Sequence, residues 1–342
     1  MSVRASFAPA RRTAAGSLTV RGARAAVYRW LWAQQQGSPF IIAANPEPWR
    51  EELQWLGLEA EEANPSPREH SGLRAGEPSW LGRLPEILPG DSAPWGVGAA
   101  ETPIADLRWL GVLPEALVNF LALLGWQPPD GASELFSRTQ LARLFDPQQI
   151  VSTPVAFDAE KLRALNHHWL QQADLDRLLA LSLPYFLAAG YLPEDPPEPV
   201  RLWLKDVIRA VLPGLDFLSL LPQRTRFVFD YSAARALEFP ESRAALERAG
   251  ARDVIREFGG RVLEENWLTR ERLAAIVEEV RKAMHGKGRS LLQPVRVMLT
   301  GLPFGPELAD LIPIFETGSQ LNLAMHVKSC RERVLEFCSV FV

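Results

Sequence analysis

The chain has 342 residues, of which 47% are hydrophobic and 23% charged, which excludes global disorder and leaves room for two or more domains. Its formal net charge of −4 excludes nucleic-acid binding through a wholly basic surface, although it is compatible with a local basic stripe. The two cysteines, Cys330 and Cys338, are too few for a disulfide framework and favour reduced thiols in the cytosol. There is no signal-peptide pattern, and Pro184 and Gly190 interrupt the most apolar run, so we expect a cytoplasmic protein without a membrane partner.

Residues 1–48 predict a β-α-β unit at the start of the chain. A helix is expected over about residues 22–36, and the apolar run 40–44 predicts a strand that ends before Asn45. Such an opening is typical of a nucleotide-binding sheet. The passage that follows, residues 64–98, is rich in proline, glycine and serine and predicts a linker.

Residues 113–126 predict a well-capped helix that belongs to the core. Pro114 suits a first helical position because its missing N–H is not needed there, and Gly125 is a natural helix stop. One face of this helix is apolar and consists of Leu113, Leu117, Phe120, Leu121 and Leu124.

Beyond residue 126 the pattern is almost wholly helical. Ser137 is the expected N-cap of a short helix over residues 136–145, and Asp158 can cap another. Further helices are predicted over residues 175–189, 200–211, 242–259 and 270–284. For the last of these, Thr269 is the expected N-cap, and Gly286 and Gly288 are expected to close it.

Several segments resemble motifs of the bacterial glutamyl-tRNA synthetases of class I. Residues 3–9 resemble the family's opening VRTRFAPSPTG, and residues 16–24 resemble GYLHVGGAR, its HIGH signature. Residues 151–166 resemble SKSPAVFDLEKLRWLN almost throughout, and residues 291–308 resemble LFMPLRVALTG and GPGLFELL. Residues 113–126 match the family's helix at which the catalytic half passes into the tRNA-binding half.

The resemblance implies that the family's ATP and substrate positions are degraded in this chain. Ser6 stands where an arginine pairs with the substrate carboxylate, and Thr19 stands where the HIGH histidine stabilises the transferring phosphate. Arg21 replaces the glycine that lets ATP approach the backbone, and Asn45 replaces the acidic residue that receives the substrate amino group. Residues 94–98 lack both lysines of the KMSKS-type motif. We therefore expect no catalytic residues, no cofactor (ATP is the family's), no metal and no aminoacylation by the chain alone.

The resemblance also implies contacts with RNA in the C-terminal part. Arg296 lies in an apolar helical segment and matches an arginine that reads an anticodon base, while an ion pair with a neighbouring helix is an equally weighted alternative. Leu308 matches a position that packs on an unstacked base, against the alternative of a core leucine. Arg224 is a weaker candidate for the same surface.

Three further candidates, Lys161, Arg163 and Asn166, lie on one expected helix and could contact the inside of the tRNA. A solvated helix face is the simpler interpretation of the two charges. The adjacent His167 and His168 diverge on a helix, so they do not predict a metal site.

Together these observations predict a mainly α fold. It should comprise a reduced Rossmann-like α/β remnant with a linker over residues 1–98, a helical connecting domain over 99–192 and a helical anticodon-binding domain over 200–342. The predicted function is binding of tRNA, with glutamate tRNA as the expected RNA and no role for DNA, by a truncated paralogue of the synthetase. Three alternatives stay open: a glutamate--tRNA ligase that acts with a partner, a helical protein-interaction module that contacts, for instance, a full-length synthetase, and a product without function.

Overall fold

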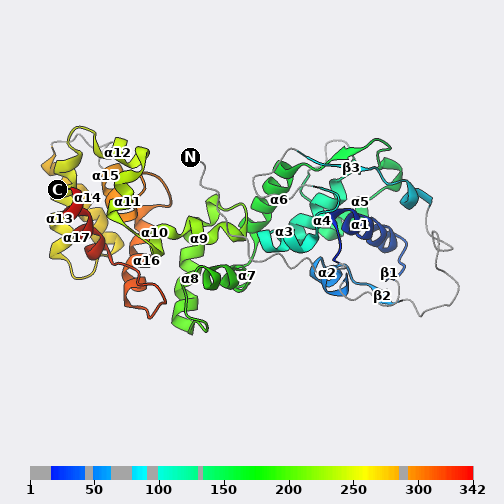
Figure 1. Ribbon diagram of the computed structural model, residues 1–342, viewed down its shortest axis with the longest axis horizontal. Coiled ribbons are helices and arrows are strands. Elements are labelled where there is room, and N and C mark those ends of the chain that lie inside the picture. The colour runs from blue at the N-terminus through cyan, green and yellow to red at the C-terminus, as the bar shows by residue number, and fades with distance from the viewer. Residues whose placement is uncertain are drawn as a thin grey trace. The chain divides into compact units, whose positions relative to one another are not determined.

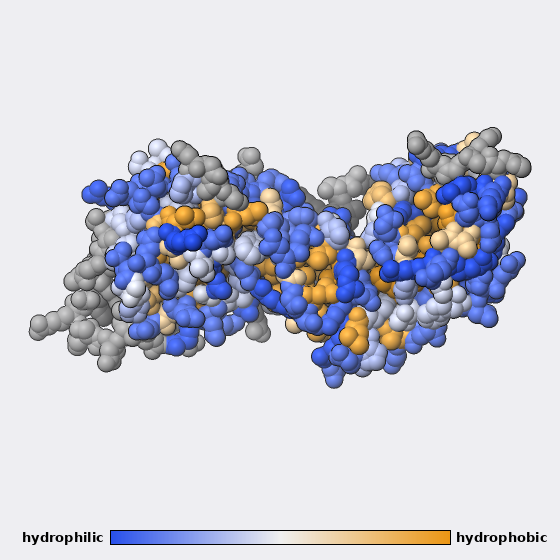
Figure 2. Space-filling view, turned by 180° about the vertical axis from the view of Figure 1, so that it is seen from behind, coloured by the Kyte–Doolittle hydropathy of each residue, from blue (hydrophilic) through white to orange (hydrophobic). Residues whose placement is uncertain are grey.

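The computed structural model describes residues 17–42, 49–62, 79–90, 99–129, 134–284 and 292–341. The fold is mainly α and divides into two compact units, Met1–Gln172 and Ala173–Val342 (Figure 1). The division lies between the sixth and seventh helices, whereas the sequence suggested a boundary at residues 192–200. None of the described helices is long and apolar enough to cross a membrane. On the face shown in Figure 2, hydrophobic residues gather in patches that are surrounded by hydrophilic ones.

The first unit combines helices with two short pairs of strands. Its elements are α1 (Val20–Gln35), β1 (Ile41–Ile42), α2 (Trp49–Trp55), β2 (Glu61–Glu62), η1 (Ser79–Arg83), β3 (Ile87–Leu88), α3 (Ile104–Leu110), α4 (Pro114–Leu123), α5 (Arg138–Leu144), η2 (Pro147–Gln149), β4 (Val155–Ala156) and α6 (Ala159–Gln172).

Both strand pairs of the first unit are parallel, as expected of a reduced α/β domain. β1 pairs with β2 across the intervening helix α2, with Ile41 opposite Glu61, so these residues form a small β-α-β unit. β3 pairs with β4, with Ile87 opposite Val155. The strand expected at the very start of the chain lies outside the described residues.

Helix α4 is the centre of the first unit and confirms the prediction for residues 113–126. Pro114 opens it, and Gly125 follows it at φ +111°, a backbone conformation that favours glycine. α4 packs against α1, α5 and α6, and seven of its residues, from Ala116 to Ala122, are buried (Figure 1). Helices α5 and α6 begin as predicted, because Ser137 caps α5 and the Asp158 carboxylate accepts the backbone N–H of Lys161.

Residues 79–90 pack into the first unit, although the sequence placed them in a linker. The Trp80 ring lies 5.9 Å from the ring of Phe145 and 6.5 Å from that of Tyr28. Gly90 lies so close to Phe157 that a Cβ atom there would be 1.8 Å from the Phe157 carbonyl oxygen. The sequence did not reveal this packing because the contact partners, Tyr28, Phe145 and Phe157, all lie more than fifty residues away along the chain.

The second unit is wholly helical in its described part. Its elements are α7 (Leu175–Ala188), α8 (Glu198–Val211), η3 (Leu212–Gly214), η4 (Leu218–Leu220), α9 (Leu221–Arg224), α10 (Arg226–Phe229), α11 (Ala233–Glu238), α12 (Pro240–Leu246), α13 (Ala251–Glu264), α14 (Arg270–Ala283), α15 (Leu292–Thr300), α16 (Leu308–Gln320) and α17 (Cys330–Phe341).

Most predicted helices of the second unit are present, and one prediction is wrong. α14 begins after its Thr269 cap, as expected, whereas Gly286 and Gly288 lie outside the described residues. The single helix predicted over residues 242–259 is instead two helices, α12 and α13. They are separated at Gly250, whose φ of +85° interrupts the right-handed helix. In the core of this unit, α13 packs against α14, α15 and α17, while α16 packs against α8 and α14.

Candidate functional site

Thr19 and Arg21, the two described positions that the family resemblance compared with the ATP motif, serve the local structure. Thr19 is the N-cap of α1, and its Oγ1 accepts the backbone N–H of Gly22 at 3.3 Å. Arg21 is exposed and forms an ion pair with Glu101 at 2.9 Å. Ser6, Asn45 and residues 94–98 lie outside the described residues.

Buried charged and polar groups of the first unit hold α4 in place. Arg24, which is only 2% exposed, donates to the carbonyl oxygens of Leu124 at 3.1 Å and Pro85 at 2.5 Å. Tyr28 donates to the same Leu124 oxygen at 3.1 Å. Burial lowers the pKa of Arg24. At the other end of α4, the fully buried Asn166 accepts the backbone N–H of Leu113 at 2.7 Å.

The candidates on α6 are therefore engaged within the protein. Besides accepting from Leu113, Asn166 donates to the Gly111 carbonyl at 3.2 Å, so its amide has a structural role and no exposed surface for RNA. Lys161 pairs with Glu134 at 2.7 Å, and Arg163 pairs with Glu160 at 2.8 Å. These two ion pairs match the solvated-face interpretation of the charges.

The second unit contains a cavity of about 990 Å³ that brings two of the predicted residues, Arg224 and Arg296, together. Its wall is formed by α8, α9, α10, α14, α15, α16 and the loop between α15 and α16. Seven charged side chains line it: Arg209, Arg224, Arg270, Arg296, Asp206, Glu307 and Asp310. Four guanidinium groups therefore face three carboxylates, which leaves an excess of positive charge.

Two of these arginines are paired with acids of the same wall. Arg209 forms an ion pair with Asp206 one turn earlier on α8. Arg270 forms an ion pair with Asp310 of α16 at 3.1 Å, with both side chains about half exposed. Because these pairs are exposed to water, each is expected to contribute no more than about 1 kcal/mol and to open readily for a ligand.

Arg296 is half buried and binds a backbone carbonyl instead of a carboxylate. Its Nη1 donates to the Pro306 oxygen at 2.5 Å, and it forms no ion pair with any described residue. Burial lowers the pKa of Arg296, and the nearby charge of Glu307 opposes that shift. A guanidinium has five N–H donors in a fixed fork. The hydrogen bond to Pro306 uses one of them, so most of this donor capacity is available to a ligand in the cavity.

Arg224, at the end of α9, is exposed and makes no hydrogen bond or ion pair within the described parts of the chain. Leu308, the other residue expected at this surface, is the first residue of α16 and is only 5% exposed. Its burial favours the core alternative over packing on a base.

A hydrogen-bond network around α17 holds α10 and α15, and of these two helices α15 carries one cavity arginine, Arg296. The fully buried Arg333 donates to the carbonyl oxygens of Phe227 at 2.8 Å and Val228 at 2.9 Å in α10, and to that of Leu299 at 2.9 Å in α15. Burial lowers the pKa of Arg333 to about 10, which leaves it charged at neutral pH.

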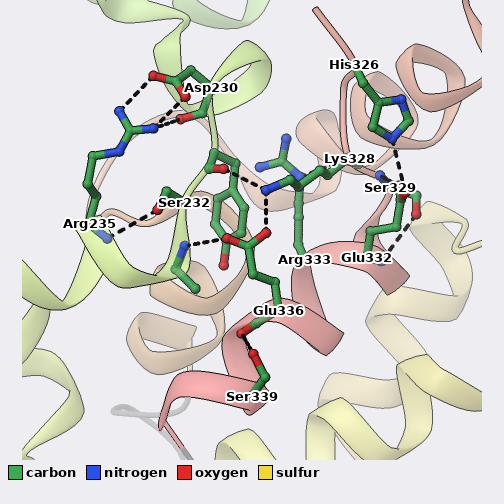
Figure 3. A network of polar contacts seen from close by, with 12 residues as sticks. Asp230, Ser232, Arg235, His326, Lys328, Ser329, Glu332, Arg333, Glu336 and Ser339 are labelled. Atoms are coloured by element: carbon green, nitrogen blue, oxygen red, sulfur yellow. Dashed lines mark hydrogen bonds and ion pairs between the residues drawn. The ribbon is translucent and has the colours of Figure 1, made fainter.

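Glu336, on the same helix, accepts from Lys328 and from the first backbone N–H of α11 (Figure 3). Helix α17 thus joins α10, α11 and α15.

Among the cavity side chains that sequence reasoning missed are Arg209, Arg270, Phe304 and Glu307. These side chains meet in the cavity because helices that are up to about a hundred residues apart in the sequence pack together, so no local pattern predicts their proximity. Only Phe304 carries a local signal, because it is an aromatic residue between the turn-forming Pro303 and Gly305. Within the described residues, no group of three or more His, Cys, Asp or Glu side chains could hold a metal ion.

Comparison with known proteins shows what the second unit is similar to. A family model described as an anticodon binding domain matches residues 177–318, a range that contains every residue of the cavity wall. The chain is 35% identical to "Glutamate--tRNA ligase 1" of Caldicellulosiruptor saccharolyticus over 213 residues, which are 62% of this chain and 43% of that protein. It is 32% identical to the "Glutamate--tRNA ligase" of Geobacillus thermodenitrificans over 229 residues, 66% of this chain and 46% of that protein. The chain thus matches less than half the length of these curated relatives.

Solved structures share the fold. A glutamate tRNA ligase from Elizabethkingia meningosepticum, in complex with its amino acid, superposes with a TM-score of 0.68 at 13% identity, over 96% of this chain and 98% of that chain. A glutamate-tRNA synthetase from Elizabethkingia anophelis superposes with a TM-score of 0.51 at 17% identity, over 89% of this chain and 57% of that chain.

Proposed function

We propose that this chain is a glutamyl-tRNA synthetase-like protein that binds tRNA through the cavity of its second unit and does not aminoacylate it alone. The observation that carries the proposal is the position of Arg224 and Arg296, two arginines without an acidic partner, in one cavity of the matched domain. Because the relatives are named as glutamate--tRNA ligases, glutamate tRNA is the expected RNA.

The two arginines suit different parts of an RNA. Arg224 is exposed, so it can neutralise a phosphate and add affinity without sequence preference. Arg296 is half buried, and its planar fork matches the paired acceptors on a base edge. A base that cannot accept these bonds would leave a desolvated guanidinium unsatisfied, which is a source of selectivity.

The absence of aminoacylation follows from the chemistry of the first unit. Formation of an adenylate requires charge placed on the transferring phosphate before the reaction begins. Thr19 offers only a hydroxyl that already caps α1, and Arg21 lies exposed in an ion pair. These residues do not fit the role of the family's ATP motif, so we derive no catalytic step from them.

The test is titration of the full chain with glutamate tRNA and with a tRNA of different anticodon, over a series of salt concentrations. Arg296→Ala should weaken binding and reduce the preference between the two tRNAs. Arg256→Ala is the matched control, because Arg256 lies exposed on α13 away from the cavity wall. An unchanged preference in Arg296→Ala would refute the base-reading role.

ATP–pyrophosphate exchange with glutamate and tRNA tests the second part of the proposal. No turnover is expected from the chain alone. Turnover that appears only when a full-length synthetase is added would favour a ligase that acts with a partner. Absence of any tRNA binding would favour a helical protein-interaction module.

A further inference from the structure

Phe304 is an exposed aromatic residue on the wall of the cavity. It exposes 63% of its surface, more than any other large hydrophobic side chain in the described part of the chain. Within that part, its ring makes no contact with another aromatic ring, whereas those of Phe227, Phe229 and Phe315 do. A single exposed apolar side chain is ordinary by itself. What distinguishes Phe304 is how its backbone is held.

The loop that carries Phe304 is fastened on both sides of the ring. Before it, the Gly301 carbonyl accepts the Ser242 hydroxyl at 2.9 Å, and the backbone N–H of Leu302 donates to Thr300 Oγ1 at 3.2 Å. After it, the Pro306 carbonyl accepts from Arg296 at 2.5 Å. The backbone of this loop is therefore held in place, so binding a ligand against the ring costs little conformational entropy.

The surroundings of Phe304 indicate the chemistry of its ligand. The same wall presents four guanidinium groups against three carboxylates, and Arg224 and Arg296 have no acidic partner. An apolar peptide bound here would bury the guanidinium charges without a partner, which costs desolvation free energy. A nucleotide can stack its base on the ring and place its phosphate near the guanidinium groups. Unpaired RNA bases are commonly bound by stacking on aromatic side chains beside arginine.

We propose that Phe304 is the platform on which one unpaired base of the bound RNA stacks, and that it takes the role the sequence suggested for Leu308. This inference rests on the proposed function. It differs from that function in naming a residue and a contact, since Phe304 is exposed on the cavity wall, whereas Leu308 is buried and does not line the cavity. The hydrogen bond from Arg296 to the Pro306 carbonyl links the loop that carries the Phe304 ring to Arg296, which is proposed to read a base edge.

The experiment uses the full chain and anticodon stem-loops of glutamate tRNA that carry 2-aminopurine at one loop position at a time. Phe304→Ala should weaken stem-loop binding by roughly 5- to 150-fold, the range measured for the loss of one base–aromatic stack. Phe304→Trp should keep affinity within a few fold because it keeps a ring, whereas Phe304→Leu should behave like Phe304→Ala. Phe239→Ala, at an exposed phenylalanine outside the cavity wall, is the control and should bind like the wild type.

Stacking has a signature that a merely structural role would not produce. At one loop position, 2-aminopurine fluorescence should be quenched by the wild type and by Phe304→Trp, but not by Phe304→Leu. The dependence of affinity on salt should be the same in all variants, because no phosphate contact is lost. Wild-type affinity in Phe304→Ala, or equal quenching by Phe304→Leu, would overturn the inference while leaving tRNA binding intact. Failure of the wild type to bind any stem-loop would overturn the proposed function together with it.

Discussion

The two units use arginine in opposite ways. In the first unit, Arg24 is buried and bonded to backbone carbonyls at the end of α4, and Arg21 is paired with an acid on the surface. In the cavity of the second unit, Arg224 and Arg296 form no ion pair with a described residue, although Arg296 lies near the charge of Glu307. Arg24 directs two of its nitrogens to backbone carbonyl oxygens of the fold, although its buried Nε has no partner. The two cavity arginines keep most of their donors for an external ligand. The contrast places the expected RNA-binding chemistry in the second unit.

The strongest test of the contrast is Asn166→Ala, at a residue that the sequence placed among the RNA contacts. The substitution leaves two buried backbone groups, the N–H of Leu113 and the carbonyl of Gly111, without their partner. We expect a loss of about 2–4 kcal/mol in the free energy of unfolding, measured by denaturant titration. The affinity of the folded variant for tRNA should not change. A variant of normal stability with weakened tRNA binding would restore Asn166 to the RNA surface.

Arg296→Lys tests the second unit with the charge retained. Lysine lacks the planar fork, so the preference between anticodons should fall by about tenfold, within the roughly 1–3 kcal/mol of a bidentate base contact. The salt dependence of binding should be almost unchanged, because the positive charge remains. Competition titration with two tRNAs measures the preference. Equal preference in Arg296→Lys and wild type would show that only the charge matters at this position.

The third test concerns the ion pairs of Asp230 in the second unit and depends on pH. Asp230 accepts hydrogen bonds from Arg235 at 2.7 Å (Figure 3) and from Arg226 at 3.1 Å. The bond from Arg235 is the main reason that the pKa of Asp230 lies below its ordinary value. A carboxylate with a lowered pKa stabilises the fold above its ordinary pKa of 3.8 and loses that effect as the pH falls through its folded value.

Asp230→Asn should therefore unfold more easily at pH 7, by about 1 kcal/mol because the carboxylate is partly exposed. At pH 3 the difference from the wild type should shrink. Thermal unfolding at the two pH values checks this. A difference that grows on acidification would contradict the assignment.

The smallest effect is expected for Lys161→Ala in the first unit. Lys161 forms a partly exposed ion pair with Glu134, so the free energy of unfolding should change by no more than about 0.5 kcal/mol. Its tRNA affinity and salt dependence should match those of the wild type. A shallower salt dependence in Lys161→Ala would mean that α6 contacts phosphate, as the family resemblance implied.

Local interactions explain what the sequence determined by itself. Helix caps depend on residues within one helical turn. This holds for the start and end of α4 and for the caps Ser137 of α5, Asp158 of α6 and Thr269 of α14. The family resemblance also pointed to Arg296 and Arg224, which do line one cavity. These features could be predicted because their signals lie in adjacent residues or in short motifs.

Only the tertiary structure decided the rest, because those features depend on partners that are distant in the sequence. The apolar pattern of residues 242–259 is compatible with one continuous helix through Gly250. In the structure, the chain breaks into α12 and α13 at this glycine, and α12 packs on α15 while α13 packs on α14, α15 and α17. The packing of residues 79–90 depends on Tyr28, Phe145 and Phe157. The family resemblance pointed to Leu308 and not to Phe304. The α16 core buries the first, and the fastened loop exposes the second beside Arg296.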